Sequence, residues 1–341
     1  MTHALTRFAR VFSARRSFRD IAPCGDPRMP YTVSSDEKGV RPVKDSHGRT
    51  IDYLRISLTD RCNFRCIYCM PSKGVQWVPH GDVLRFEEIV HLVRLLSGLG
   101  IRRVRLTGGE PLVREGILDL AAALHALPGI DEIHLTTNGV LFAPMADQLR
   151  QAGIHGVNFS LDTLQPDIFR RITRTDQFAA ARAGIDKALE AGFPSVKVNC
   201  VLIRGINDGE AAALAALAKD APLEVRFIEM MPIGCGRGYT PVPTEEVYAA
   251  LVKSFGKPNA FTTPLGSGPA VYVSFPAFQG HVGFISAMTH VFCARCNRVR
   301  LTAEGYLKPC LHNPAGTDLR TPLRTGMDDA ALTALLRRAI E

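Results

Sequence analysis

The sequence predicts an α/β fold in which six strand–helix units form an incomplete (β/α)6-type TIM barrel, followed by a smaller C-terminal region. Short runs that alternate or stay apolar, as strands do, are each followed by a segment with helical periodicity. Such alternation implies right-handed crossovers and a parallel sheet. Six units exceed what a mononucleotide-binding half needs and fall short of a closed eightfold barrel, so the count favours an open barrel.

The strands are expected where β-branched and apolar residues alternate with polar ones, from YLRISL to LEVRFIE. The helical segments between them space their apolar residues three and four apart, as in FEEIVHLVRLLSGLG. Three of these segments end near a glycine, which suits a helix C-cap. The six strands are expected, in chain order, at 53–58, 103–107, 132–136, 156–161, 195–202 and 223–229.

The pattern changes at both ends of this repeat. The N-terminal stretch lacks periodicity and is rich in proline, glycine, serine and charge. After residue 232 come a glycine- and proline-rich stretch, a helix, and apolar runs around 271–286. We therefore expect a leader or flexible arm over 1–45, the partial barrel over 46–232 and a C-terminal region over 233–341.

Composition and charge set broad limits on the class of protein. The 341 residues are 46% hydrophobic and 22% charged, as in ordinary globular proteins, and no apolar run approaches the roughly 18 residues of a membrane span. The net charge of +8 suits an anionic partner such as nucleic acid, a phosphate-bearing ligand or anionic lipid. Much of the excess lies in the first twenty residues, which hold five arginines and one acid.

The N-terminus and the cysteines bear on location. No apolar segment with a cleavage site for secretion is present, so a cytoplasmic location is expected. The arginine-rich start is also typical of a mitochondrial transit peptide, and translation from Met29 would explain it equally well. Nine cysteines in a protein that is not secreted indicate metal or redox chemistry rather than disulfides.

The first cysteine cluster, CNFRCIYC, follows the first expected strand. Three thiolates, Cys62, Cys66 and Cys69, can hold three irons of a cubane cluster and leave the fourth iron free for a substrate or cofactor. The alternatives are a structural zinc site completed by His80, or buried thiols without a ligand. Tyr68, between two of the cysteines, either packs over whatever the open iron binds or fills the core.

The stretch LTGGEP, residues 106–111, ends the second expected strand. Paired glycines let the backbone approach a ligand closely, and their carbonyls can accept from an ammonium group. Glu110 offers a carboxylate. A glycine pair after a strand is often only a turn, but its position one unit after the cysteine loop favours a ligand site.

A second triad, Cys293, Cys296 and Cys310, repeats the pattern of three thiolates without a fourth. A second four-iron cluster with an open iron fits it, and zinc with His290 or His312 is the alternative. The other cysteines show no metal spacing and are expected to be incidental or buried: Cys24, Cys200 and Cys235.

Positive charges lie within several expected strands. Arg55, Arg105 and Lys197 belong to three of them, and Arg298 and Arg300 alternate after Cys296, so that a strand would place both on one face. Converging guanidinium groups suit a polyphosphate, although any one such residue alone is more often a solvated or salt-bridged surface residue. Neither a Walker A loop nor GxGxxG occurs, so a nucleotide would have to be held in another way.

Together these motifs resemble the radical S-adenosylmethionine (SAM) superfamily. The second triad and the arginine pair narrow the resemblance to the GTP 3′,8-cyclase family, which performs the first step of molybdenum cofactor biosynthesis. The similarity runs from about residue 46 to residue 325. It rests on the stretches DYLRISLTDRCNFRCIYCMP, RLTGGEPLVR, LTTNG, NFSLDTL, RFIEMMPIG and CNRVRLTAEGYLKPCL.

The resemblance implies two 4Fe-4S clusters, one on each triad, with SAM on the open iron of the first and the guanine of GTP facing the second. It implies that SAM is lined by Tyr68, Gly109, Ser160 and Met231. It implies that GTP is contacted by Arg55, Arg105, Thr136, Lys197, Arg298, Val299 and Arg300.

The resemblance also implies the chemistry. One electron from the first cluster splits SAM, and the resulting 5′-deoxyadenosyl radical takes hydrogen from the ribose 3′ carbon of GTP, which then closes onto C8 of the purine. The protein would supply positioning, charge neutralisation and exclusion of water. The implied partners are an electron donor, the downstream cyclic pyranopterin monophosphate synthase, which takes the product, and possibly a second copy of the chain; no membrane is expected.

Family members end in a glycine pair that reaches the active site, whereas this sequence ends in LLRRAIE. Either the sequence is truncated by some tens of residues or this member lacks the tail. In both cases we expect both clusters to assemble but not full cyclase activity. Two other functions were weighed. Another radical SAM enzyme with an auxiliary cluster, such as a peptide-modifying one, would share the first triad and GGEP but has no need for the arginine pair. A zinc-containing protein that binds nucleic acid would explain the cysteines and the basic charge.

Overall fold

The computed structural model describes residues 42–312 and 315–341. All of them belong to one compact unit, residues 33–341. Most of the predicted leader, together with Cys24 and Met29, lies outside the described residues. No helix in the described part of the chain is long and apolar enough to cross a membrane.

A single sheet of twelve strands carries the described part of the fold, in the order β12-β11-β10-β1-β2-β3-β4-β5-β6-β9-β8-β7. Its centre is six consecutive parallel strands, which lie where the sequence predicted them. The α/β class with a parallel sheet is thus confirmed. The six strands are β1 (Tyr53–Ser57), β2 (Arg103–Thr107), β3 (Glu132–Thr137), β4 (Gly156–Ser160), β5 (Ser195–Val201) and β6 (Glu224–Ile228).

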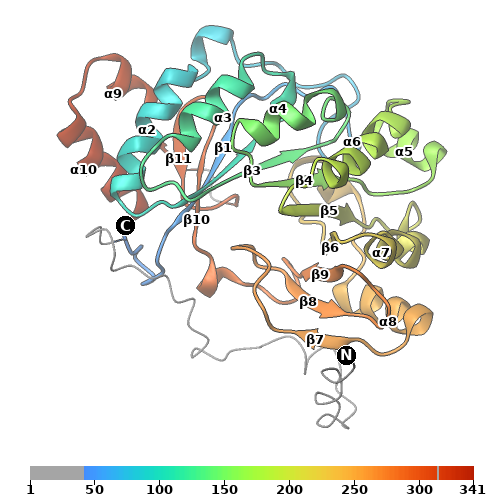
Figure 1. Cartoon of the computed structure of the whole chain (residues 1–341). Helices are drawn as coiled ribbons and strands as arrows, with labels where there is room; N and C mark the ends of the chain where they lie inside the picture. Colours follow the sequence, from blue (N-terminus) through green and yellow to red (C-terminus); the bar gives the residue numbers. More distant parts are fainter. Residues whose placement is uncertain (1–41, 313–314) are drawn as a thin grey trace, which may run out of the picture. The chain divides into compact units, whose positions relative to one another are not determined.

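Because each crossover is right-handed and each strand pairs with the one before it, the connecting helices lie on one side of the sheet (Figure 1). One of them, α5, was not predicted: it is short, begins with Pro166 at its first turn and precedes the expected α6. The helices of this side are α2 (Phe86–Gly98), α3 (Ile117–His125), α4 (Ala146–Gln151), α5 (Pro166–Thr173), α6 (Phe178–Glu190) and α7 (Ala211–Asp220).

The segment after residue 232 adds strands to both edges of the same sheet. At one edge β9 pairs parallel with β6, and at the other β10 pairs parallel with β1. Outside these two strands, each further strand pairs antiparallel with its neighbour: β11 with β10, β12 with β11, β8 with β9 and β7 with β8. The elements are α8 (Thr244–Phe255), β7 (Asn259–Phe261), β8 (Val271–Ser274), β9 (His281–Ile285), β10 (Arg298–Leu301), β11 (Tyr306–Lys308), β12 (Thr317–Asp318), α9 (Arg320–Arg324) and α10 (Asp329–Ile340).

Short 3-10 helices join several of these elements. Glu110 begins one of them, because its side chain accepts a hydrogen bond from the backbone N–H of Leu112 and Pro111 occupies the first turn. The 3-10 helices are η1 (His80–Asp82), η2 (Pro111–Val113), η3 (Ala143–Met145), η4 (Asp208–Glu210), η5 (Gly234–Gly238) and η6 (Cys293–Arg295).

The two faces of the central sheet differ in chemistry. The residues that point to the helices are apolar and fully buried, as at Leu54, Val104 and Val157. Residues one position along point to the other face. There Arg55 lies beside Arg105 on β2 and beside Arg300 on β10. The alternation thus places the hydrophobic core under the helices and a polar, cationic row on the opposite face.

Candidate functional site

A cavity of about 200 Å³ lies at the carboxyl ends of β1 to β4. It is lined by the first cysteine loop, which follows β1, by the glycine pair after β2 and by polar residues at the ends of β3 and β4. The carboxyl ends of parallel strands are where α/β folds of this type build their sites. The predicted residues that line it are Cys62, Cys66, Tyr68, Cys69, Gly109, Glu110, Thr136 and Ser160.

The first cysteine loop is held by the end of α5. The N–H of Arg65 donates to the carbonyl of Thr173 at 3.0 Å, and that of Ile67 donates to Ile172 at 2.9 Å. Arg174 donates from Nη1 to the carbonyl of Arg65 at 2.8 Å. These hydrogen bonds fix the backbone of the loop, and the side chains of its three cysteines line the cavity.

The thiols of this loop influence one another. A hydrogen bond between Cys66 and Cys69, together with burial, raises the pKa of Cys66, and the same hydrogen bond lowers the pKa of Cys69. Burial raises the pKa of Cys62. In the described chain no three Cys, His, Asp or Glu side chains form a site for a single metal ion. A four-iron cluster makes a different demand, because each thiolate binds its own iron atom, and three thiols around one cavity fit it.

The glycine pair packs against the cysteine loop. Gly109 donates to the carbonyl of Thr59 at 2.7 Å, and the next N–H, of Glu110, donates to that of Arg61 at 2.8 Å. A Cβ on Gly109 would lie 2.2 Å from the Arg61 carbonyl oxygen, and one on Gly108 would lie 2.6 Å from that of Thr59. The need for glycine therefore comes from the neighbouring backbone, in addition to the predicted approach of a ligand.

Glu110 was expected to offer its carboxylate to a ligand, and the structure gives it another role. It is 1% exposed, and it accepts hydrogen bonds from Leu112 N–H at 3.1 Å, Thr137 Oγ1 at 2.8 Å and Asn138 N–H at 2.7 Å. Burial raises its pKa, and these hydrogen bonds partly offset the effect. The carboxylate joins the loops after β2 and β3, so it shapes the cavity wall.

Replacing Glu110 with glutamine is expected to lower the free energy of unfolding by about 1–3 kcal/mol, because the amide nitrogen cannot accept from Asn138 and leaves a buried N–H unpaired. Thermal unfolding of the two proteins measures this. Glu115→Gln, at an exposed position on the same loop, serves as the control and should leave the midpoint unchanged. Equal midpoints for all three proteins would contradict the role of Glu110.

Of the residues expected around SAM, the cavity brings together Tyr68, Gly109 and Ser160 but not Met231. Met231 lies nearby, with its sulfur accepting from Nε2 of His312 at 3.2 Å. The Tyr68 hydroxyl donates to Asp162 at 2.5 Å. Burial raises the pKa of Asp162 to about 6. Asp162 lines the cavity and was not predicted, although it lies in the stretch NFSLDTL.

The cationic row on the polar face is partly buried, and one of its guanidinium groups has an unpaired nitrogen. Arg55 has a buried Nε with no hydrogen-bond partner in the described structure. Burial, and then the charge of Arg300, lowers the pKa of Arg55 to about 9. Arg105 donates to the Tyr53 hydroxyl and, at 3.4 Å, to Oγ1 of Thr136, which also lines the cavity. An unpaired buried donor among like charges is what an anionic ligand would satisfy.

Lys197 extends this row on β5. Its Nζ donates to the carbonyl of Leu265 at 2.6 Å and lies 3.2 Å from Glu224. Burial lowers its pKa to about 8, against the opposing charge of Glu224. Arg226, one strand further on, is also buried and donates to Asn199 at 2.9 Å. It was not predicted, although its alternation with Glu224 in LEVRFIE places it on this face.

The second triad lies at the opposite end of β1 from the first. Cys296 comes just before β10, which runs parallel to β1, and the hairpin to β11 returns the chain so that Cys310 lies near the start of β10. Cys296 therefore lies at the amino end of its strand, whereas the first triad follows the carboxyl end of β1. The predicted pairing of Arg298 and Arg300 on one face is confirmed by the register.

The two histidines that are candidate zinc ligands at the second triad have other partners. His312 contacts Met231, and Nδ1 of His290 lies 3.4 Å from Glu245. Cys293 and Cys310 are exposed, and the charge of Arg300 interacts with Cys310 and Cys296. The donors at this triad are therefore sulfur atoms beside a cation, a set that also fits a cluster with one iron per thiolate.

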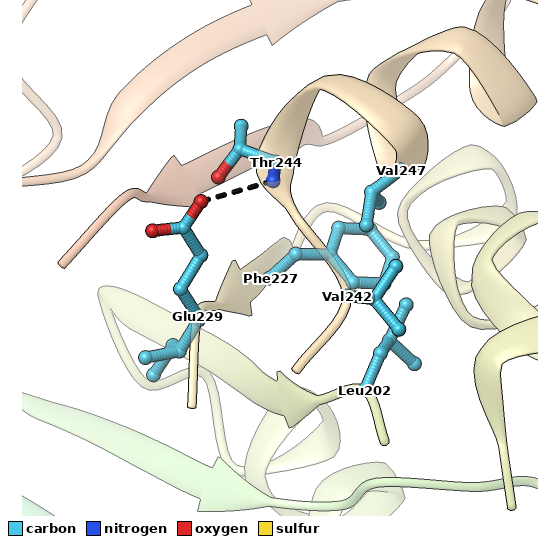
Figure 2. Close-up of a pocket in the computed structure, with 7 residues that line it drawn as sticks. Leu202, Phe227, Glu229, Val242, Thr244 and Val247 are labelled. Atoms are coloured by element: carbon cyan, nitrogen blue, oxygen red, sulfur yellow. Dashed lines mark hydrogen bonds between the residues drawn. The ribbon is translucent and has the colours of Figure 1, made fainter. Parts of the chain in front are cut away.

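Glu229, just after β6, holds the segment that leads to this triad. It is 4% exposed and accepts from the N–H of Thr244 at 3.0 Å, as Figure 2 shows, and from the N–H groups of Met288 and Thr289. Burial opposes its ionisation, but these hydrogen bonds hold its pKa below the usual value. The adjoining cavity of about 10 Å³, lined by Phe227 and other apolar residues, has room for about one water.

Two family models match the chain. Residues 56–218 match the Radical SAM superfamily, and residues 223–341 match Molybdenum Cofactor Synthesis C. Among solved structures, Streptococcus suis SuiB bound to precursor peptide SuiA has a TM-score of 0.55 at 14% identity, covering 80% of this chain and 63% of that one. SuiB bound to S-adenosylmethionine has a TM-score of 0.52 at 15% identity, covering 85% and 69%. The fold and the first cysteine loop therefore define a radical SAM protein.

Curated relatives are more specific. The GTP 3′,8-cyclase of Desulforamulus reducens is 48% identical over 87% of this chain and 92% of its own length. That of Pelotomaculum thermopropionicum is 48% identical over 87% and 93%. That of Moorella thermoacetica is 46% identical over 87% and 93%. The chain belongs to the GTP 3′,8-cyclase family.

Proposed function

We propose that the chain is a GTP 3′,8-cyclase, which converts GTP to a 3′,8-cyclised nucleotide in the first step of molybdopterin biosynthesis. The observation that carries this is the cationic row, in which Arg55 has an unpaired buried Nε, between two cysteine triads at opposite ends of β1. The identities of 43–48% to relatives with this name support it. We further infer that the six central units form an incomplete barrel, whose polar face encloses the substrate.

The first triad would hold a 4Fe-4S cluster through Cys62, Cys66 and Cys69, with SAM beside it in the cavity. That cluster would supply the single electron that splits SAM and so generates the radical for the reaction. The chain's part is to orient and enclose SAM: Tyr68 is fixed by its hydrogen bond to Asp162, and Gly109 and Ser160 line the same cavity. Met231 would complete the SAM site from the neighbouring loop.

The cationic row would orient the triphosphate of GTP. Arg55, Arg105, Lys197, Arg298 and Arg300 offer positive charge, offset at Lys197 by Glu224, and fork-shaped guanidinium donors suit phosphate oxygens. Thr136 lines the SAM cavity and contacts Arg105, so it lies where the two ligands would meet. The Val299 side chain is 1% exposed on the apolar face, so any contact from it would use the backbone.

GTP binding is expected to weaken as the pH rises through about 8, because Lys197, whose pKa is lowered to about 8, then loses the charge that attracts phosphate. The loss should reach about tenfold per pH unit at most. Titrating GTP binding between pH 7 and pH 8.5 measures it. Lys197→Arg keeps its charge throughout and should flatten the dependence. Parallel curves for the two proteins would contradict the role of Lys197.

The second triad would hold a further 4Fe-4S cluster through Cys293, Cys296 and Cys310 in the C-terminal region, facing the guanine end of GTP. The remaining expectations are also part of this proposal: an electron donor, product transfer to cyclic pyranopterin monophosphate synthase, a possible homodimer and a cytoplasmic location. The named relatives supply no support for the mitochondrial alternative.

Anaerobic reconstitution followed by incubation with SAM, GTP and a strong reductant tests the function. About eight irons per chain, 5′-deoxyadenosine and a cyclised nucleotide are expected. Deoxyadenosine without a cyclised nucleotide would contradict the cyclase and favour another radical SAM activity. One or two zinc ions in place of iron would favour the nucleic-acid-binding alternative.

A further inference from the structure

Arg49 lies in a tight turn that leads into β1. The N–H of Asp45 donates to the Arg49 carbonyl at 3.0 Å, and Gly48, with φ of 73°, donates to the Asp45 carbonyl at 2.8 Å. The Asp45 carboxylate accepts from the backbone N–H of Arg49 at 2.9 Å and from its Nε at 2.7 Å. The Arg49 side chain is 17% exposed and the Asp45 side chain is 7% exposed. The turn and its carboxylate therefore fix the direction in which the guanidinium points.

The free end of this guanidinium reaches the second triad. Nη1 of Arg49 donates to the backbone carbonyl of Cys293 at 2.7 Å, across 244 positions of sequence. Its charge is close enough to interact with the side chains of both Cys293 and Cys296. Arg49 thus contacts the backbone of one expected ligand and places a positive charge beside two of them.

The other anchors of this loop differ from Arg49 in charge. Glu229 accepts from Met288 and Thr289 at the start of the loop. At its end, Asn297 donates to Asp52 at 2.6 Å. Both anchors are carboxylates and contact the loop outside its cysteines. Of these three contacts, only that of Arg49 brings a cation to the cysteines themselves.

We propose that Arg49 is a positioning residue for the second cysteine triad, fixing Cys293 and stabilising the negative charge that three thiolates and their cluster would carry. The inference rests on the proposed function, because it requires a cluster at this triad. A fixed cation beside a redox centre favours its reduced form, and the effect is strong where water is partly excluded. Arg49 should therefore favour both retention of the cluster and its reduction.

The test uses the full chain with Cys62, Cys66 and Cys69 changed to serine, so that only the second triad can hold a cluster. In this background Arg49→Met removes the charge and the donors, and Arg49→Lys keeps the charge. We expect Arg49→Met to retain less than half of the iron of the background and its remaining cluster to be reduced at a more negative potential. Arg49→Lys should restore the potential. Arg94→Met, at an exposed ion pair on α2, is the control.

Iron content and a potentiometric titration followed by electron paramagnetic resonance provide the readouts, independently of cyclisation. If Arg49→Met misfolds, Arg49→Gln replaces it in the test, because glutamine is also neutral but keeps a hydrogen-bond donor. If these neutral variants have the same iron content and reduction potential as the background protein, the inference is overturned and the proposed function stays intact. A background protein that binds zinc, or no iron, would instead overturn the second cluster, and the inference with it.

Discussion

Replacing Arg55 with methionine is expected to lower GTP cyclisation strongly and, at the same time, to raise the resistance of the protein to unfolding. Arg55 has a buried, unpaired Nε and lies beside Arg105 and Arg300. At neutral pH its charge is therefore a cost to the folded state without ligand. Methionine fills a similar volume without that charge, so the free energy of unfolding should rise by about 1–3 kcal/mol.

The same change would remove a donor that we propose for the triphosphate. Losing one partner of a buried charge pair costs about 2–5 kcal/mol, so cyclisation should fall by roughly 30-fold or more. SAM cleavage should continue, because Arg55 does not line the cavity at the first triad. Thermal unfolding, deoxyadenosine and cyclised nucleotide are measured on each variant, with Arg182→Met, at an exposed site on α6, as the control.

The combination separates a site residue from a structural one. A purely structural arginine would lose stability on substitution, whereas a residue kept for its ligand should gain stability and lose activity. An Arg55→Met protein that unfolds more easily, or that cyclises GTP at the wild-type rate, would refute the role we assign to this side chain.

Gly109→Ala is expected to remove the first cluster. The added methyl would lie 2.2 Å from the carbonyl oxygen of Arg61 and 2.8 Å from that of Asp60, both backbone atoms in the loop that precedes Cys62. Backbone atoms in this position can move only if the loop moves. The hydrogen bonds from Gly109 and Glu110 to this loop would then break, and the cysteines would lose their common orientation.

The measurements are iron content after reconstitution and formation of 5′-deoxyadenosine. Gly109→Ala should lose about half of the iron and at least a hundredfold in SAM cleavage, by analogy with other changes that misplace reacting groups. Gly209→Ala is the matched control, because a Cβ there meets nothing within 4 Å and its φ is ordinary. Full iron and wild-type cleavage in Gly109→Ala would show that the loop tolerates the methyl.

The central strands and the first cysteine loop could be predicted because their signals are local. Alternation along YLRISL and RVRLT fixes which residues face the helices, and the cysteine spacing fixes three donors on one loop. The order of these strands in the sheet could also be predicted, because each βα unit places its strand beside the preceding one.

The features that could not be predicted depend on contacts between distant parts of the chain. Nothing in the sequence around Arg298 shows that β10 would join the sheet beside β1, so the position of the second triad relative to the first could not be predicted. Asp162, Glu229 and Arg49 gain their roles from partners dozens to hundreds of residues away. The glycine pair was predicted as a ligand site, but its steric reason, the backbone of Arg61, was visible only in the folded chain.

Strand β1 has a consequence for the size of what can react here. Its five residues, at about 3.3 Å each, measure roughly 16 Å from the loop of one triad to the loop of the other. Because β2 and β10 flank it in fixed register, this length cannot stretch or slip. The length of β1 therefore sets how long a molecule must be to contact both cysteine loops. A substrate much shorter than the strand would leave one of the two loops without a contact.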